Sequence, residues 1–225
     1  MTFPEFPASL DARLAHMAET RAALLRVIDA VAPGFSPGAA PVAAGFSPAL
    51  APVAPGYSPA AAPESGPAGT DTALKVGPTM GEWSMTEIVY HLHLSEKSIA
   101  RLLRKRLASA DRNQLAGEEQ LRTEWERVAR LVGIRKSKAK APVFAEPTQA
   151  PALTVGIELL GQARQMLLEV VRSVPYSDLL RVSAPHPFEA IGTLTGASWL
   201  SVVAFHERRH TEQILEIAHD GKLTL

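Results

Sequence analysis

The sequence contains no cysteine among its 225 residues, and this absence excludes several classes of protein. Without a thiol, the chain cannot form a disulfide scaffold, a thiolate metal site, a redox motif or a cysteine nucleophile. An excess of charge of one sign is also missing, because 23 basic side chains balance 23 acidic ones. This balance argues against a protein that wraps nucleic acid over its whole surface.

Segments for targeting or membrane insertion are not recognisable either. The N-terminal residues lack a basic region followed by an apolar one, which a signal peptide would need. No uncharged apolar run of about 18 residues has a composition compatible with a helix. The longest uncharged stretch, residues 31–63, is rich in proline. We therefore expect a cytoplasmic protein with no membrane partner.

Apolar residues recur at spacings of three and four in four long segments, a pattern that predicts amphipathic helices. The predicted helices cover about residues 7–32, 84–110, 153–174 and 194–219. Ser9 is the expected N-cap of the first helix, and Ser84 that of the second. Because no convincing strand pattern is present, the sequence predicts an all-α fold, an up-down four-helix bundle that forms a single domain over residues 1–225.

A proline-rich segment follows the first predicted helix. Residues 33–67 hold nine of the eighteen prolines and repeat an eleven-residue unit as GFSPGAAPVAA, GFSPALAPVAP and GYSPAAAPESG. Proline at every third or fourth position prevents a helix or a sheet ladder from persisting. Residues 33–70 are therefore predicted to be a disordered low-complexity insertion. A docking segment that uses the aromatic residue of each repeat is the less favoured alternative.

A second long connection, residues 111–150, is predicted to be partly helical, with a short helix over residues 118–132. It also contains the basic run RKSKAK, and a further basic cluster, Arg101 to Arg106, ends the second predicted helix. Such clusters can contact phosphate or nucleic acid. Neutral net charge and the lack of interleaved aromatic residues favour a solvated surface and no nucleic-acid partner.

The last predicted helix carries His206 and His210 four residues apart, which places both imidazoles on one face. Residues before and after them on this face are apolar, so the imidazoles need buried partners. A shared metal ion would satisfy both, and so would separate hydrogen bonds. This helix alone does not discriminate between the two interpretations.

The second predicted helix adds another imidazole. His91 lies beside the apolar stripe and is expected to face the core, whereas His93, roughly 200° around the helix, is expected to face solvent. An inward His91 opposite His206 and His210 would give three neutral nitrogen ligands with open positions, which is typical of a catalytic metal site. Imidazole suits zinc, nickel, iron and copper, so the sequence predicts a divalent ion without naming it.

Two further polar residues lie one turn from these histidines. Glu87 could orient the imidazole of His91, but a capping box with Ser84 is its favoured role. Gln213 follows His210 by one turn and could bond a ligand imidazole or a bound water.

The acid that follows His206, Glu207, points about 100° away from it on a helix. We therefore expect a salt bridge with Arg208 or Arg104 for this residue, and no catalytic role.

These motifs together resemble the DinB-like superfamily. The second predicted helix carries W-S-x-x-E-I-x-x-H-L from Trp83 to Leu92, and the last carries H-x-x-x-H-x-x-Q-I from His206 to Ile214. The sequence H-P-F that begins at His186 is similar to the family's approach to its last helix. The resemblance covers about residues 7–32, 74–110 and 150–221.

The resemblance implies a four-helix bundle, often a homodimer, with one divalent metal on three histidines. The motif places these ligands at His91, His206 and His210. Characterised members include metal-dependent transferases and isomerases that use low-molecular-weight thiols, and many members have no known activity.

We therefore expect a metal-dependent enzyme that transfers or adds a small-molecule thiol to a small-molecule substrate. Because the chain has no cysteine, the thiol must arrive as a cofactor. Apolar walls expected from Trp199, Val203 and Ile88 would favour transfer over hydrolysis. A metal-dependent hydrolase and a non-catalytic, stress-related metal-binding bundle are the alternatives.

Overall fold

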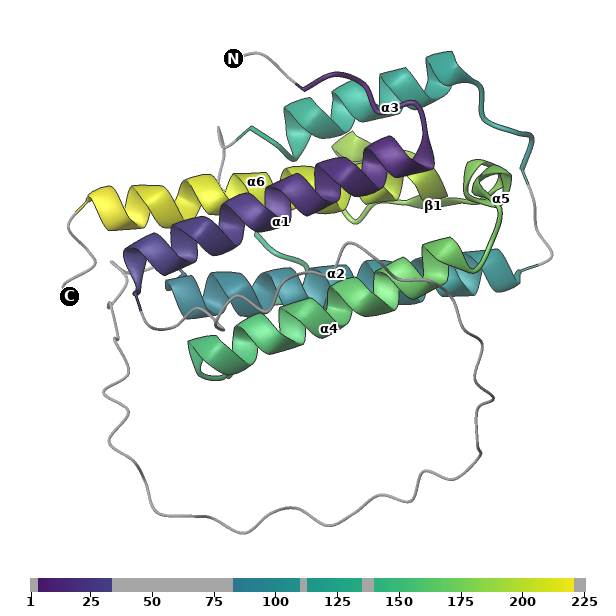
Figure 1. Ribbon diagram of the computed structural model, residues 1–225. Helices are drawn as coiled ribbons and strands as arrows, with labels where there is room; N and C mark the ends of the chain where they lie inside the picture. Colours follow the sequence, from purple (N-terminus) through teal and green to yellow (C-terminus); the bar gives the residue numbers. More distant parts are fainter. Residues whose placement is uncertain (1–3, 34–82, 110–112, 135–139, 221–225) are drawn as a thin grey trace, which may run out of the picture.

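The computed structural model describes residues 4–33, 83–109, 113–134 and 140–220, and these form the predicted all-α bundle. Within them, four long helices build the bundle: α1 (Leu10–Val31), α2 (Met85–Ala108), α4 (Leu153–Arg172) and α6 (Gly196–His219). Helices α1 and α6 lie side by side as one pair, and α2 and α4 form the other pair (Figure 1). The insertion predicted from residue 33 lies outside the described residues from residue 34 onward, as does most of the basic run that follows α3.

Local hydrogen bonds explain where the first two helices begin. The Ser9 hydroxyl accepts the backbone N–H of Ala12 at 3.2 Å and caps α1. At the start of α2, the Ser84 hydroxyl accepts the N–H of Glu87, and the Glu87 carboxylate accepts the N–H of Ser84 at 2.7 Å. This reciprocal pair is the predicted capping box, which satisfies two backbone donors that the helix leaves free.

The connection between α2 and α4 contains the predicted short helix, α3 (Glu118–Leu131), which packs against α6. Trp125 and Val128 are buried, whereas Leu131 at the end of the helix is 40% exposed. A short 3-10 turn, η1 (Val143–Ala145), then lies against α2. The connection therefore places a turn of backbone beside the helix that carries His91.

The expectation that the chain has no strand is wrong in one place. Two three-residue strands, β1 (Ser183–Pro185) and β2 (Thr193–Thr195), pair in antiparallel fashion between α4 and α6. A 3-10 turn, η2 (Glu189–Ile191), and Gly192 at a φ of 72° connect them. Strands of three residues are too short for alternating hydrophobicity to reveal them.

A six-residue helix, α5 (Tyr176–Arg181), also went unpredicted after Pro175. It packs against the start of α6, which begins at Gly196 rather than near Leu194. A Cβ atom at Gly196 would lie 2.9 Å from the backbone oxygen of Leu179, so glycine allows this close approach.

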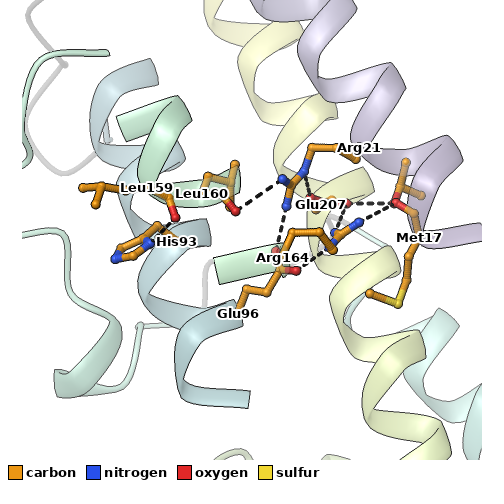
Figure 2. A network of polar contacts seen from close by, with 9 residues as sticks. Met17, Arg21, His93, Glu96, Leu159, Leu160, Arg164 and Glu207 are labelled. Atoms are coloured by element: carbon orange, nitrogen blue, oxygen red, sulfur yellow. Dashed lines mark hydrogen bonds and ion pairs between the residues drawn. The ribbon is translucent and has the colours of Figure 1, made fainter. Parts of the chain in front are cut away.

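The buried apolar residues form two clusters along the bundle. One contains Met17, Leu103, Leu167 and Phe205 among others. The other contains Leu24, Ile88, Leu160 and Ile214 among others. Along α1, Arg21 lies between Met17 of the first cluster and Leu24 of the second, and Figure 2 shows the network of charged side chains around Arg21 and Arg164. Among the described residues, none of the helices combines the length and the apolar character that crossing a bilayer requires.

Candidate metal centre

Three imidazoles from two helices converge on one point between α2 and α6. The Nε2 atom of His206 lies 3.1 Å from that of His91 and 3.0 Å from that of His210. One nitrogen from each ring lies within 4.8 Å of the other two. The structure thus brings together the three histidines that the sequence placed on inward helix faces; they are called the histidine triad below.

Hydrogen bonds on the far side of two rings fix their protons. His91 donates its Nδ1–H to the carbonyl oxygen of Ala145 at 2.7 Å, and His210 donates its Nδ1–H to Oε1 of Gln213 at 2.8 Å. Because both acceptors are oxygens without a proton, Nδ1 must carry the hydrogen in each neutral ring. The Nε2 atom of each ring therefore carries a lone pair, and both Nε2 atoms lie close to Nε2 of His206.

Burial keeps the imidazoles of His91 and His206 neutral. Desolvation lowers the pKa of His91 to about 4, against the weaker opposing effect of its bond to Ala145. Desolvation, followed by the neighbouring rings of His210 and His91, lowers the pKa of His206 well below its ordinary value. The neutral ring is the form that binds metal, so His91 and His206 are ready to bind a cation at neutral pH.

The aromatic ring of Trp83 lies against two members of the triad. The ring of Trp83 lies 4.5 Å from that of His91 and 6.2 Å from that of His210, measured between centroids. His91 and His210 are buried, and His206 has intermediate exposure. The sequence motif includes Trp83, but the motif alone did not predict that this ring packs against the triad. An aromatic residue directly before the helix cap could have indicated such packing.

A fourth histidine lies near the triad without joining it. His186, in the loop after β1, stacks on Trp199 at 5.2 Å between ring centroids, and its Nδ1 accepts the N–H of Phe188 at 3.1 Å. Burial lowers the pKa of His186 to about 4. The electrostatic interaction with His186 is the smallest of the causes that lower the pKa of His206. A neutral His186 that accepts at Nδ1 carries its proton on Nε2.

The two polar neighbours expected near the triad have different partners. The carboxylate of Glu87 accepts hydrogen bonds from both the N–H and the hydroxyl of Ser84, so it serves the helix cap. Gln213 does contact a triad member, through its bond to His210. The walls expected from Ile88, Val203 and Trp199 are all buried.

The expectation that His93 faces solvent is wrong. His93 is only 5% exposed, and it donates its Nδ1–H to the carbonyl oxygen of Leu159 on α4 at 2.8 Å. Its ring also stacks near Tyr90. Helix α2 is covered by α6 on one side and by α4 on the other, so both of its histidine-bearing faces are buried.

The expectation for Glu207 is also wrong, because this residue is only 1% exposed and does not pair with Arg208 or Arg104. Its carboxylate contacts Arg21 at 2.5 Å and Arg164 at 3.0 Å, while Arg208 pairs with Glu212. Three members of the basic cluster at the end of α2, Arg101, Arg104 and Lys105, are exposed as expected, whereas Arg106 is partly buried.

The sequence model of the DinB superfamily matches residues 68–214, a range that includes the whole histidine triad. The chain belongs to the DinB superfamily. It is 28% identical over 151 residues to the uncharacterized protein YuaE of Bacillus subtilis (strain 168). That alignment covers 66% of this chain and 85% of YuaE. No solved structure matches the chain.

Proposed function

We propose that this DinB-superfamily protein is a metal-dependent enzyme that adds or transfers a small-molecule thiol. Its metal would be a divalent ion held by His91, His206 and His210. The observation that carries the proposal is the convergence of three Nε2 atoms at 3.0 and 3.1 Å, with Nδ1 of two rings already used in hydrogen bonds.

A metal ion would satisfy the three Nε2 atoms better than a single shared hydrogen would. One hydrogen on Nε2 of His206 could satisfy His91 or His210, but not both, since both present lone pairs. A tetrahedral zinc ion with nitrogen ligands at about 2.0–2.1 Å would hold the nitrogens about 3.3 Å apart. Two of the three separations, 3.0 and 3.1 Å, lie near this value, and the third is within 4.8 Å. Zinc, nickel and iron all accept such a ligand set.

Three neutral ligands leave the charge of the ion uncompensated. A divalent ion so held lowers the pKa of a bound thiol or water and stabilises the resulting anion. The chain's own groups prepare this site: Ala145 and Gln213 orient two rings, and Trp83 shields them from bulk water. Partial exposure at His206 leaves an approach for the reactants.

One feature supports a thiol over water as the nucleophile: the ring of Trp83 covers that of His91 and keeps water scarce beside it, which disfavours hydrolysis. The chain has no cysteine, so the thiol would be a separate molecule. In an addition, its sulfur would bond to one atom of a polarised double bond, and the π electrons would take up the S–H proton at the other atom. In a transfer, the leaving group would depart from the carbon with the bonding electrons and take up that proton. A metal-dependent hydrolase at the same triad is the second candidate, because partly exposed His206 also admits water.

The test begins with metal analysis of protein purified without an affinity tag. Metal-loaded protein is then incubated with a panel of low-molecular-weight thiols and a generic electrophile. The inactive comparison is His210→Ala, and the matched control is His219→Ala, which changes an exposed histidine on the same helix. We expect thiol-dependent turnover in the wild type and in His219→Ala, and loss of both metal and turnover in His210→Ala.

Turnover without any thiol would replace the transferase with the hydrolase. Tight metal binding with no turnover under either condition would leave a non-catalytic metal-binding bundle. Undiminished metal content in His210→Ala would overturn the ligand assignment itself.

A further inference from the structure

Each of the four long helices contributes one buried charged side chain to a closed ring. These are Arg21 of α1, Glu96 of α2, Arg164 of α4 and Glu207 of α6, called the charge ring below (Figure 2). Arg21 contacts Glu96 at 2.7 Å and Glu207 at 2.5 Å. Arg164 contacts Glu207 at 3.0 Å and also pairs with Glu96. Charges alternate around the ring, so the four sum to zero.

The charge ring is buried and has further bonds. The side chains of its arginines are 12–13% exposed, and those of its acids only 1–3%. Arg164 donates to the carbonyl oxygen of Met17 on α1 at 3.0 Å. The hydroxyl of Thr20 donates to Glu207 at 2.9 Å. These additional bonds fix the rotamers of the ring as well as its charges.

The ring joins the two helix pairs of the bundle. Arg21 and Glu207 belong to the α1–α6 pair, and Glu96 and Arg164 belong to the α2–α4 pair. Two of the four ion pairs, Arg21 with Glu96 and Arg164 with Glu207, therefore cross from one helix pair to the other.

The histidine triad crosses the same boundary. His91 comes from the α2–α4 pair, and His206 and His210 come from the α1–α6 pair. Glu207 directly follows His206 on α6, and Glu96 follows His91 by five residues on α2. Both helices that supply triad histidines are thus held, close to those histidines, by carboxylates that share the same two arginines.

Stability alone does not explain such a ring. Desolvating four charges is costly, and apolar residues of similar size often stabilise a core at least as well. Directional ion pairs differ from apolar contacts because they accept one rotation and one register. A shift by one residue rotates a helix by about 100° and translates it by about 1.5 Å. Such a shift would break contacts of 3.0–3.1 Å between the triad nitrogens.

We propose that the charge ring positions the histidine triad: it fixes the rotation and register of α6 relative to α2, so that three imidazoles meet at one point. Its members are positioning residues that act through the helix backbones, without contact to a metal or substrate. This inference rests on the proposed function only in that metal affinity is one of its readouts.

The main test is the double variant Glu96→Gln/Arg164→Met. It removes one charge of each sign and both ion pairs that cross between the helix pairs, while Arg21 and Glu207 remain as a neutral couple within α1–α6. Buried charge therefore stays balanced. The matched control is Leu103→Ala, which opens a cavity in the apolar cluster two turns from Glu96 on α2.

The probe is Co²⁺, added to the metal-free full chain, with its dissociation constant and visible absorption spectrum as readouts. We expect the double variant to weaken Co²⁺ binding about tenfold or more and to change the spectrum, since partners that orient ligands typically contribute factors of 10–100. Leu103→Ala should lower the melting temperature but retain the wild-type dissociation constant and spectrum. Equal changes in both variants would mean general destabilisation and would overturn the proposal, as would wild-type binding in the double variant.

A second readout needs no metal. In the metal-free wild type, nuclear Overhauser contacts between the ring protons of His91 and those of His206 are expected, and the double variant should lose them. If wild-type protein binds no Co²⁺, the proposed function fails while these contacts still decide the role of the ring. If the double variant does not fold, Arg164→Lys serves instead, because it keeps the charge but has one nitrogen in place of the separate nitrogens with which Arg164 contacts Glu96, Glu207 and Met17. Ring contacts that persist in the variants would overturn the proposal.

Discussion

The buried triad makes stability depend on pH in a direction that the structure fixes. Desolvation holds the pKa of His91 at about 4 in the folded chain, against 6.5 for an unperturbed histidine. As pH falls below 6.5, the unfolded chain takes up a proton at this residue and the folded chain does not. Stability is therefore fully present above pH 6.5 and is lost as pH falls towards 4.

The magnitude follows from the two pKa values. A difference of about 2.5 units corresponds to about 3.4 kcal/mol over the whole range, of which about 2 kcal/mol is lost between pH 7 and pH 5. Because His91 is only 4% exposed, solvent screening does not reduce this value appreciably.

The measurement is urea unfolding at pH 7 and pH 5 in the presence of a chelator, for wild type and His91→Gln. The variant keeps a polar side chain but does not titrate in this range. We expect the wild type to lose about 2 kcal/mol more than the variant on acidification. Equal losses in the two proteins would refute the claim that His91 is held neutral by burial.

Three further predictions concern single side chains. Gln213→Ala removes the acceptor that orients His210 and should weaken metal binding about 10–100-fold, measured by competition with a chromophoric chelator; unchanged affinity would contradict that role. Phe205→Ala removes a fully buried ring and should cost about 3–5 kcal/mol in urea unfolding, and a loss below about 1 kcal/mol would show that the site collapses freely. Gly196→Ala should lower the melting temperature, because its Cβ would lie 2.9 Å from a backbone oxygen. Gly161→Ala should raise the melting temperature, because its Cβ would meet nothing within 4 Å. Equal shifts in the two variants would argue against the close approach at Gly196.

Periodicity and caps were sufficient to predict the four long helices. The apolar stripe of α1 and the S-x-x-E box at Ser84 define segments that the structure reproduces within a few residues. Helical geometry also sufficed to bring His91 towards His206 and His210, because all three share faces with apolar residues. Both results depend only on contacts within a helix or on which face of a helix is buried.

Interactions between distant segments escaped the same reasoning. A helical wheel with one buried face places His93 and Glu207 outside, but α2 and α6 are each covered on more than one side. The charges of Arg21 and Glu96 interrupt otherwise apolar stripes, which was a readable sign of buried polar partners. Nothing in the sequence shows that these charges pair with one another, because that depends on how four helices are brought together.

The hydrogen bond from His91 to the backbone of Ala145 affects which mutations alter the site during evolution. Every residue type offers a carbonyl oxygen, so substitutions at this position retain the acceptor as long as the side chain remains small enough for a site that is 1% exposed. The identity of a small side chain at residue 145 therefore has little effect on this hydrogen bond. The path of the connection that carries η1 determines whether the carbonyl oxygen reaches His91. Insertions or deletions between α3 and α4 would alter the orientation and basicity of a metal-binding imidazole without changing any histidine.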